Sequence, residues 1–262
     1  MDKDYSKKPA GDADFIPGIY NYCDHWCERC PFTARCMNYA LSKEQFSEPG
    51  SQDIRHHMFW QKLSEAFRTT RELLEDVLQN YGIDLELVDI EVTEQEGQNK
   101  LERVEHHECT RAAKSYSRLV DEWFEAYGAL LIEKHHAGDE HDRAFVEEMN
   151  RLNESLEIIR WYQHQIFIKM MRAVSGKIDE ASGKGEEENP KDCDGSAKVA
   201  LIGIDRSIMA WMALRHDVPE QKDDIIDTLV YLDRLRKSIE KYFPDARAFI
   251  RPGFDEDENV EP

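Results

Sequence analysis

Two apolar stretches decide the fold: IIRWYQHQIFIKMMRAV at residues 158–174 and AKVALIGIDRSIMAWMAL at residues 197–214. Each is long enough for several helical turns, and each carries apolar side chains on most of its helical faces. A helix of this kind is stable when neighbouring elements surround it. We therefore predict an all-α protein in which these two helices are central.

Amphipathic patterns on both sides of these stretches predict further helices. Apolar residues recur three or four positions apart, which is typical of helices that bury one face. The expected helices span residues 52–82, 99–137, 140–175, 196–216 and 219–243. We expect Asp194, Gly195 and Ser196 to cap the fourth helix, and we interpret 83–98 as a connector. The sequence thus predicts a bundle of about five helices over residues 52–251.

The rest of the chain has a different composition. Residues 1–16 and 252–262 are polar and contain little that could be buried, so we interpret both as tails, the second one acidic. Residues 175–196 are rich in Gly, Glu, Asp and Lys, which is typical of a flexible loop. Residues 17–40 hold four cysteines and several aromatic residues, so we predict a separate cysteine-rich, metal-binding module.

The net charge restricts the classes of partner. The 262 residues include 54 Asp and Glu against 34 Lys and Arg, which gives a formal charge of −20. Such a polyanion repels phosphate backbones and anionic membrane surfaces, so we expect neither nucleic acid nor membrane as a partner. No apolar run approaches the roughly 20 residues of a membrane helix, and we find no signal-peptide core. We expect a cytoplasmic protein whose partner is another protein, with a basic surface as the complement to its charge.

The cysteine module has the spacing C-x3-C-x2-C-x5-C, formed by Cys23, Cys27, Cys30 and Cys36. In a reducing cytoplasm such a group indicates metal binding rather than disulfides. Thiolates are soft ligands that select zinc, copper(I) or iron-sulfur clusters. His25, inside the same loop, is an alternative ligand should one cysteine stay free.

Two metal centres fit this spacing. Structural zinc sites usually join two ligand pairs that are a dozen or more residues apart, and no such separation exists here. Four closely spaced ligands wrap the chain around the metal, which favours a [4Fe-4S] cluster, while zinc stays the alternative. Aromatic neighbours could shield a cluster and Thr33 could donate to its sulfurs. These neighbours are Tyr20, Tyr22, Trp26 and Phe32.

The first three cysteines resemble the C-x3-C-x2-C motif of radical S-adenosylmethionine enzymes, over residues 23–30 only. The resemblance implies an iron-sulfur cluster. The chain departs from that family in three ways. Arg29 stands where the family usually has an aromatic residue, and Cys36 would bind the iron that the family leaves open for S-adenosylmethionine. The alternating strands and helices of the family's barrel are also missing from the sequence pattern. The spacing from Cys27 to Cys36 is similar to part of the pattern in auxiliary-cluster domains of such enzymes, which also implies iron and sulfur.

Charged residues within the two central helices form a second group of candidates. They are Glu157, His164, Lys169, Arg172, Asp205 and Arg206. Buried charges must be paired or hydrogen-bonded, so one interpretation is an internal network that joins Asp205 to Lys169 or Arg160. The other interpretation is a pocket for an anionic ligand, in which the three cationic side chains form a wall and the others serve as acid-base groups.

Carboxylate metal sites are less well supported. A di-iron bundle needs a Glu-x-x-His pattern, and the nearest substitutes are Glu102 with His106 and Glu154 with Glu157. The run 223–227 has the Asp-Asp-x-x-Asp spacing of magnesium sites in prenyl-chain enzymes, but a first helical turn favours carboxylates without any metal. The sequence therefore predicts a metal-binding helical protein with a redox, sensing or enzyme-accessory role. The alternatives are a zinc-stabilised adaptor and an enzyme with a polar pocket between the central helices.

Overall fold

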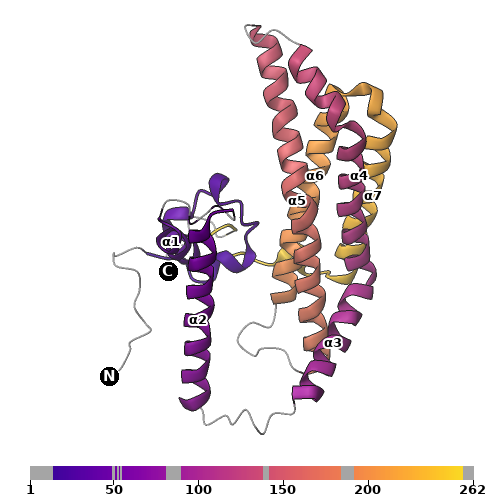
Figure 1. The fold of residues 1–262 in the computed structure, drawn as a ribbon. Helices are drawn as coiled ribbons and strands as arrows, with labels where there is room; N and C mark the ends of the chain where they lie inside the picture. Colours follow the sequence, from indigo (N-terminus) through magenta and orange to yellow (C-terminus); the bar gives the residue numbers. More distant parts are fainter. Residues whose placement is uncertain are drawn as a thin grey trace. The chain divides into compact units, whose positions relative to one another are not determined.

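The computed structural model describes residues 14–48, 51, 53, 55–80, 90–137, 142–183 and 192–255. Within these ranges the only regular secondary structure is helical, which confirms the prediction of an all-α protein. The chain divides into two compact units, Met1–Gly97 together with Pro252–Pro262, and Gln98–Arg251. Each unit is described by itself (Figure 1).

The first unit contains the cysteine segment. Three short 3-10 turns, Ile19–Tyr22, Cys27–Arg29 and Thr33–Arg35, lead into α1 (Met37–Gln45), and α2 (His57–Asn80) follows. Backbone hydrogen bonds close two of these turns: the Cys30 amide donates to the Cys27 carbonyl at 3.2 Å, and the Cys36 amide donates to the Thr33 carbonyl at 3.4 Å. The sequence did not indicate α1.

The second unit is built on four long helices. They are α4 (Glu108–Ala137), α5 (Arg143–Ala181), α6 (Asp192–Asp217) and α7 (Lys222–Tyr242). Neighbouring pairs pack in the order α4, α5, α6, α7 and back to α4, so the four helices surround one core (Figure 1). The predicted bundle of about five helices is therefore wrong in its size, because α2 belongs to the first unit. The boundary between the units falls within α3 (Ile90–His106).

A histidine divides the long helix predicted for residues 99–137. His107 lies between α3 and α4, and its Nδ1 accepts a hydrogen bond from the amide of Cys109 at 3.2 Å. This bond satisfies an amide that the first turn of α4 leaves unpaired. Burial lowers the pKa of His107, which favours the neutral ring that such an acceptor requires. Histidine is not a usual N-cap residue, so the pattern gave no sign of the break.

Helices occupy both ends of the segment 175–196, for which a loop is expected. α5 continues to Ala181 and α6 begins at Asp192, so Asp194, Gly195 and Ser196 lie within the helix rather than capping it. Arg172 holds the start of α6 by two hydrogen bonds to the carboxylate of Asp192, at 2.7 and 3.2 Å. Polar composition alone did not indicate this helix start, because it depends on an ion pair with a residue 20 positions earlier in the chain.

The core of the second unit follows the predicted stripes, with side chains buried at every third or fourth position. The largest fully buried ones are Tyr116, Leu152, Ile159, Tyr162, Ile166, Met170, Leu201, Ile204, Trp211, Leu214 and Phe243. On α7, Ile225 is buried and Val230 is exposed.

Gly203 lets α5 and α6 approach closely. A Cβ atom at this position would lie 2.9 Å from Cδ1 of Tyr162 and 3.1 Å from Cγ1 of Ile166. We expect Gly203→Val to lower the free energy of unfolding by about 1–3 kcal/mol, because extra atoms overpack a filled interface.

Urea denaturation measures this change, and Gly128→Val is its matched control. Gly128 lies in α4 and has open space around its Cβ position, so valine there should leave stability nearly unchanged. Equal effects at the two positions would show that the contact between α5 and α6 is not tight.

Candidate metal centre

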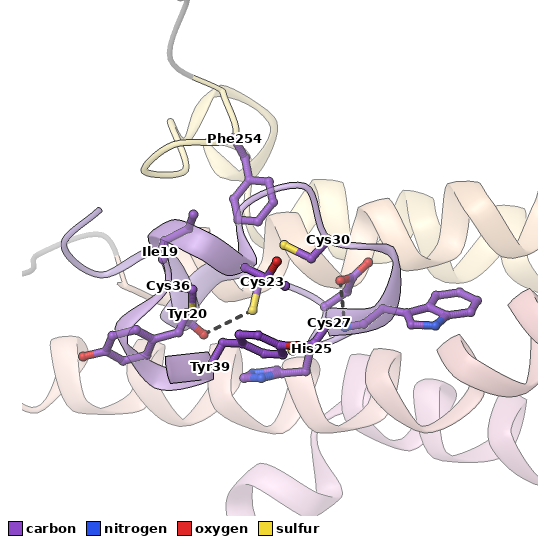
Figure 2. A pocket seen from close by; sticks show the side chains of 12 residues that line it. Ile19, Tyr20, Cys23, His25, Cys27, Cys30, Cys36, Tyr39 and Phe254 are labelled. Carbon is purple, nitrogen blue, oxygen red and sulfur yellow. Dashed lines mark hydrogen bonds between the residues drawn. The ribbon is translucent and has the colours of Figure 1, made fainter. Parts of the chain in front are cut away.

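The four cysteines of the predicted module line one pocket in the first unit. This pocket has a volume of about 320 Å³, including the part that is open to solvent. Figure 2 shows the cysteines with Tyr20, Tyr39 and Phe254 around them. The other residues of the wall are Ile19, Asp24, His25, Trp26 and Thr33. The segment 23–36 thus brings its four thiols to a common space.

Short-range hydrogen bonds shape the loop that carries Cys23 and Cys27. The Cys23 thiol donates to the Tyr20 carbonyl at 3.5 Å, and the Trp26 amide donates to the Asp24 carboxylate at 3.2 Å. His25 has a φ of +56°, a left-handed conformation that non-glycine residues seldom adopt. This turn lets the Cys27 amide reach the His25 carbonyl at 3.0 Å. The strained residue therefore lies between two candidate ligands, where it sets their direction.

The thiols affect one another electrostatically. Burial raises the pKa of Cys27, and the negative charges of Cys23, Cys30 and Cys36 raise it further, followed by Glu28. The four side chains are therefore close enough for their charges to interact. All six cysteines lie in the described part of the chain, and none of them forms a disulfide.

The thiols share a pocket but do not yet converge on one point. Among the described residues, no three His, Cys, Asp or Glu side chains are grouped so that they could hold a metal ion. Any metal bound here therefore requires side-chain movement, which is common when a ligand binds. The donor set itself, four thiols beside aromatic rings, has the chemistry that zinc and iron-sulfur clusters select.

The aromatic residues expected around the cysteines are only partly in place. Tyr20 and Trp26 line the pocket, and Arg29 lies over the Trp26 ring at 4.1 Å from its centroid. Tyr22 is buried but does not belong to the pocket wall, and Phe32 packs against Phe254. Sequence reasoning missed Tyr39 and Phe254. Tyr39 lies three residues after Cys36 on α1, so only the unpredicted helix could have indicated it.

The other two cysteines are buried in the second unit. Cys109 is fully buried, and burial raises its pKa to about 11. Cys193 was expected in a polar loop, but it lies in α6 and is 1% exposed. Burial and a hydrogen bond to Glu180 raise its pKa to about 12, so its thiol is unreactive.

Four of the six charged candidates of the central helices, His164, Arg172, Asp205 and Arg206, contact different partners. His164 hydrogen-bonds Ser117 at 2.9 Å, and Arg206 donates to the Tyr162 hydroxyl. Arg172 pairs with Asp192, Glu157 is exposed, and Lys169 is buried at 4% exposure. Neither the thiol pocket nor the cleft between α4 and α7 is lined by any of the six.

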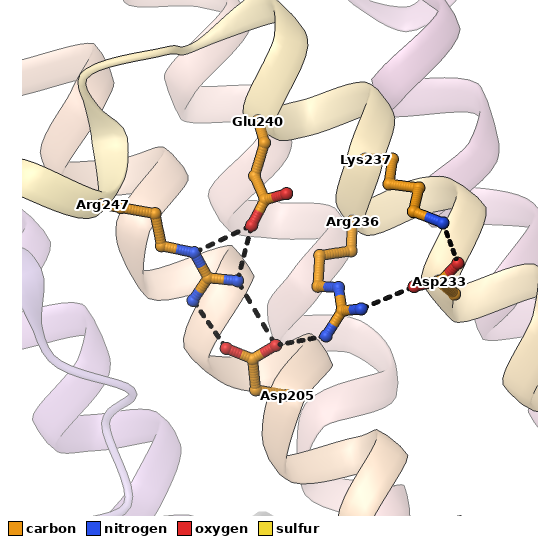
Figure 3. A network of polar contacts seen from close by, with 6 residues as sticks. All are labelled: Asp205, Asp233, Arg236, Lys237, Glu240 and Arg247. Carbon is orange, nitrogen blue, oxygen red and sulfur yellow. Dashed lines mark hydrogen bonds and ion pairs between the residues drawn. The ribbon is translucent and has the colours of Figure 1, made fainter.

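Asp205 pairs with neither Lys169 nor Arg160, which corrects the predicted internal network. The Asp205 carboxylate forms ion pairs with Arg247 at 2.6 Å and with Arg236 at 3.5 Å. Arg247 also pairs with Glu240, and Arg236 pairs with Asp233, which in turn pairs with Lys237 (Figure 3). The reason is helical geometry. Gly203 faces α5, and Asp205, two residues further along α6, is rotated by about 200° around the helix axis from Gly203 and so points away from α5. The network therefore ties α6 to α7 and to the 3-10 turn Ala246–Ala248.

The acidic run at 223–227 borders the cleft between α4 and α7. Asp224 and Asp227 line it with Glu122, and the Tyr127 hydroxyl donates to Asp224. Asp223 and Asp224 lie in the first turn of α7, where carboxylates stabilise the helix dipole. Stabilisation of the helix dipole therefore accounts for the first two carboxylates of the Asp-Asp-x-x-Asp run without a magnesium ion.

Comparison of the chain with protein-family models, with curated proteins and with solved structures finds no match. Among the described residues, no helix is long and apolar enough to cross a membrane.

Proposed function

We propose that Cys23, Cys27, Cys30 and Cys36 bind a [4Fe-4S] cluster and that the protein acts in electron transfer, in redox sensing or as an accessory to a partner enzyme. One observation carries this proposal: four thiols from a segment of 14 residues line a single pocket with aromatic walls. Four cysteine thiolates are the usual ligand set of such a cluster. We place the protein in the cytoplasm, where thiols stay reduced.

Electrostatics supports a cationic occupant of the pocket. Burial raises the pKa of Cys27, and the charges of the other three cysteines raise it further, so a thiolate at Cys27 is unfavourable without a cation beside it. Metal cations offset this repulsion and release the protons when they bind. The sulfurs then have to move inward, and rotation of the cysteine side chains beside the short turns Cys27–Arg29 and Thr33–Arg35 is the simplest such movement.

A bound cluster supplies one-electron transfer. The chain's contribution is to hold the ligands and limit the access of water, through Tyr20, Tyr39 and Phe254. With all four cysteines as ligands, no iron stays open for a substrate. The enzyme alternative has no comparable support, because His164, Arg172 and Asp205 each contact a different partner instead of facing one shared pocket.

Zinc is the second candidate, because four thiolates also complete its tetrahedral coordination. In that case the first unit is a structural clasp, and the acidic chain is an adaptor that docks a basic protein. The charge of −20 supports such a partner by electrostatic complementarity.

Metal and sulfide analysis of anaerobically purified protein, with an absorption spectrum, tests the proposal. We expect about four irons and four sulfides per chain, a brown solution and a broad absorption band at about 400 nm. One zinc per chain in a colourless protein would contradict the iron-sulfur cluster and support the structural zinc site instead. Absence of both metals would contradict metal binding by this segment.

A further inference from the structure

A segment from the other end of the described chain completes the thiol pocket. Pro252–Asp255 belongs to the first unit, with the cysteines, although more than 200 residues separate the two in sequence. Phe254 is part of the pocket wall, where Figure 2 shows its ring beside the cysteine loop. We expected this segment to be the start of an acidic tail.

The contact requires glycine at position 253. Its φ is +74°, which favours glycine, and a Cβ atom there would lie 2.8 Å from Cδ1 of Ile16 and 3.1 Å from Cδ1 of Ile19. Ile16 and Ile19 are both buried. The backbone therefore passes directly over these two side chains, and a larger residue would have to displace them.

Phe254 is fixed against the loop that joins two of the thiols. Its ring meets the Phe32 ring edge to face, with centroids 5.0 Å apart and an angle of 81° between the planes. Phe32 lies between Cys30 and Cys36 in sequence. Edge-to-face pairs are favourable beyond their buried area, so the contact holds the segment in place.

We propose that Gly253 and Phe254 form a strap that closes the thiol pocket, and that the Phe254 ring shields the four cysteines from molecules in solution. The part of this inference that concerns a metal rests on the proposed function. The shielding itself is a property of the pocket, so it is measured after a chelator has removed any bound metal, which would itself block alkylation of the thiols.

The rate at which iodoacetamide alkylates each cysteine tests the strap, resolved by mass spectrometry on the full-length protein. Phe254→Ala should increase the rates at Cys23, Cys27, Cys30 and Cys36 several-fold. Cys109 and Cys193, buried in the second unit, should react as slowly as before. Gly253→Ala should act in the same direction, and Phe254→Leu, which keeps apolar bulk, should restore most of the protection.

Phe46→Ala is the matched control. Phe46 lies in the same unit and stacks on Phe59 at 6.3 Å, but it is not part of the pocket wall. Its removal should leave the four rates unchanged. Equal alkylation rates in wild-type protein and Phe254→Ala would overturn the strap, and so would an equal increase in Phe46→Ala.

Metal content measured on the same samples keeps the two proposals apart. If wild-type protein holds metal, Phe254→Ala should hold the same amount when purified but lose it faster to a chelator. If wild-type protein holds none, the proposed function fails, while the alkylation rates still decide on the strap.

Discussion

Trp211→Ala is expected to lower the free energy of unfolding by about 3–5 kcal/mol, the range for truncating a large aromatic side chain in a core. Trp211 is fully buried in α6, and its ring meets the Trp123 ring edge to face at 5.0 Å. Its Nε1 donates to the Tyr116 hydroxyl at 3.1 Å, across to α4. The substitution therefore leaves a cavity and also removes a hydrogen-bond partner from a buried hydroxyl.

Urea denaturation followed by circular dichroism measures this loss. Met212→Ala is the control, because Met212 is the next residue of α6 and is 58% exposed. It should change stability by no more than about 0.5 kcal/mol. Trp211→Phe should fall between the two. A loss below about 1 kcal/mol for Trp211→Ala would show that α4 and α6 do not share this core.

Cys27→Ser is expected to remove most of the bound metal. A serine hydroxyl loses its proton far less readily than a thiol, and its oxygen is a harder ligand than sulfur. It therefore does not replace a thiolate at a metal that prefers soft ligands. Cys27 is the thiol whose pKa responds to all three of the others. Removing even an outer-shell partner typically costs about 10–100-fold in metal affinity, so the loss of a ligand should cost more.

Elemental analysis of the purified variant measures the remaining metal, and Cys109→Ala is the control. Cys109 is buried in the second unit and has no companion at ligand spacing, so its variant should keep the wild-type metal content. Wild-type metal content in Cys27→Ser would contradict the assignment of four cysteine ligands. Circular dichroism should show most of the wild-type helix content in both variants, because α4–α7 contain none of the four candidate ligands.

Periodicity predicted most of the bundle, because a helix that must bury one face repeats its apolar residues with the helical period. Tyr116, Val120 and Trp123 of α4 follow this spacing, and all three are buried. What the pattern could not supply was the boundary at His107, where a side-chain cap ends one helix and begins the next. It also could not show that Asp192 begins α6, since the bond to Arg172 depends on tertiary structure.

The candidate site was predictable where its residues are close in sequence. The spacing of Cys23, Cys27, Cys30 and Cys36 indicated a common site, and all four line one pocket. Phe254 gave no such sign, because it follows Gly253 in a short polar segment far from the cysteines. A contact of that kind depends on where the chain returns, which local spacing does not contain. Asp205 was misassigned for a similar reason, because its partner Arg247 lies beyond the end of α7.

X-ray absorption at the metal edge tests the central claim most directly, because it identifies the atoms bound to the metal. For a centre held by Cys23, Cys27, Cys30 and Cys36, we expect a first shell of sulfur alone. A cluster adds a second shell of iron neighbours, while zinc shows only four sulfurs at about 2.3 Å. A first shell dominated by oxygen or nitrogen would contradict the account, because it would place the metal away from the thiol pocket.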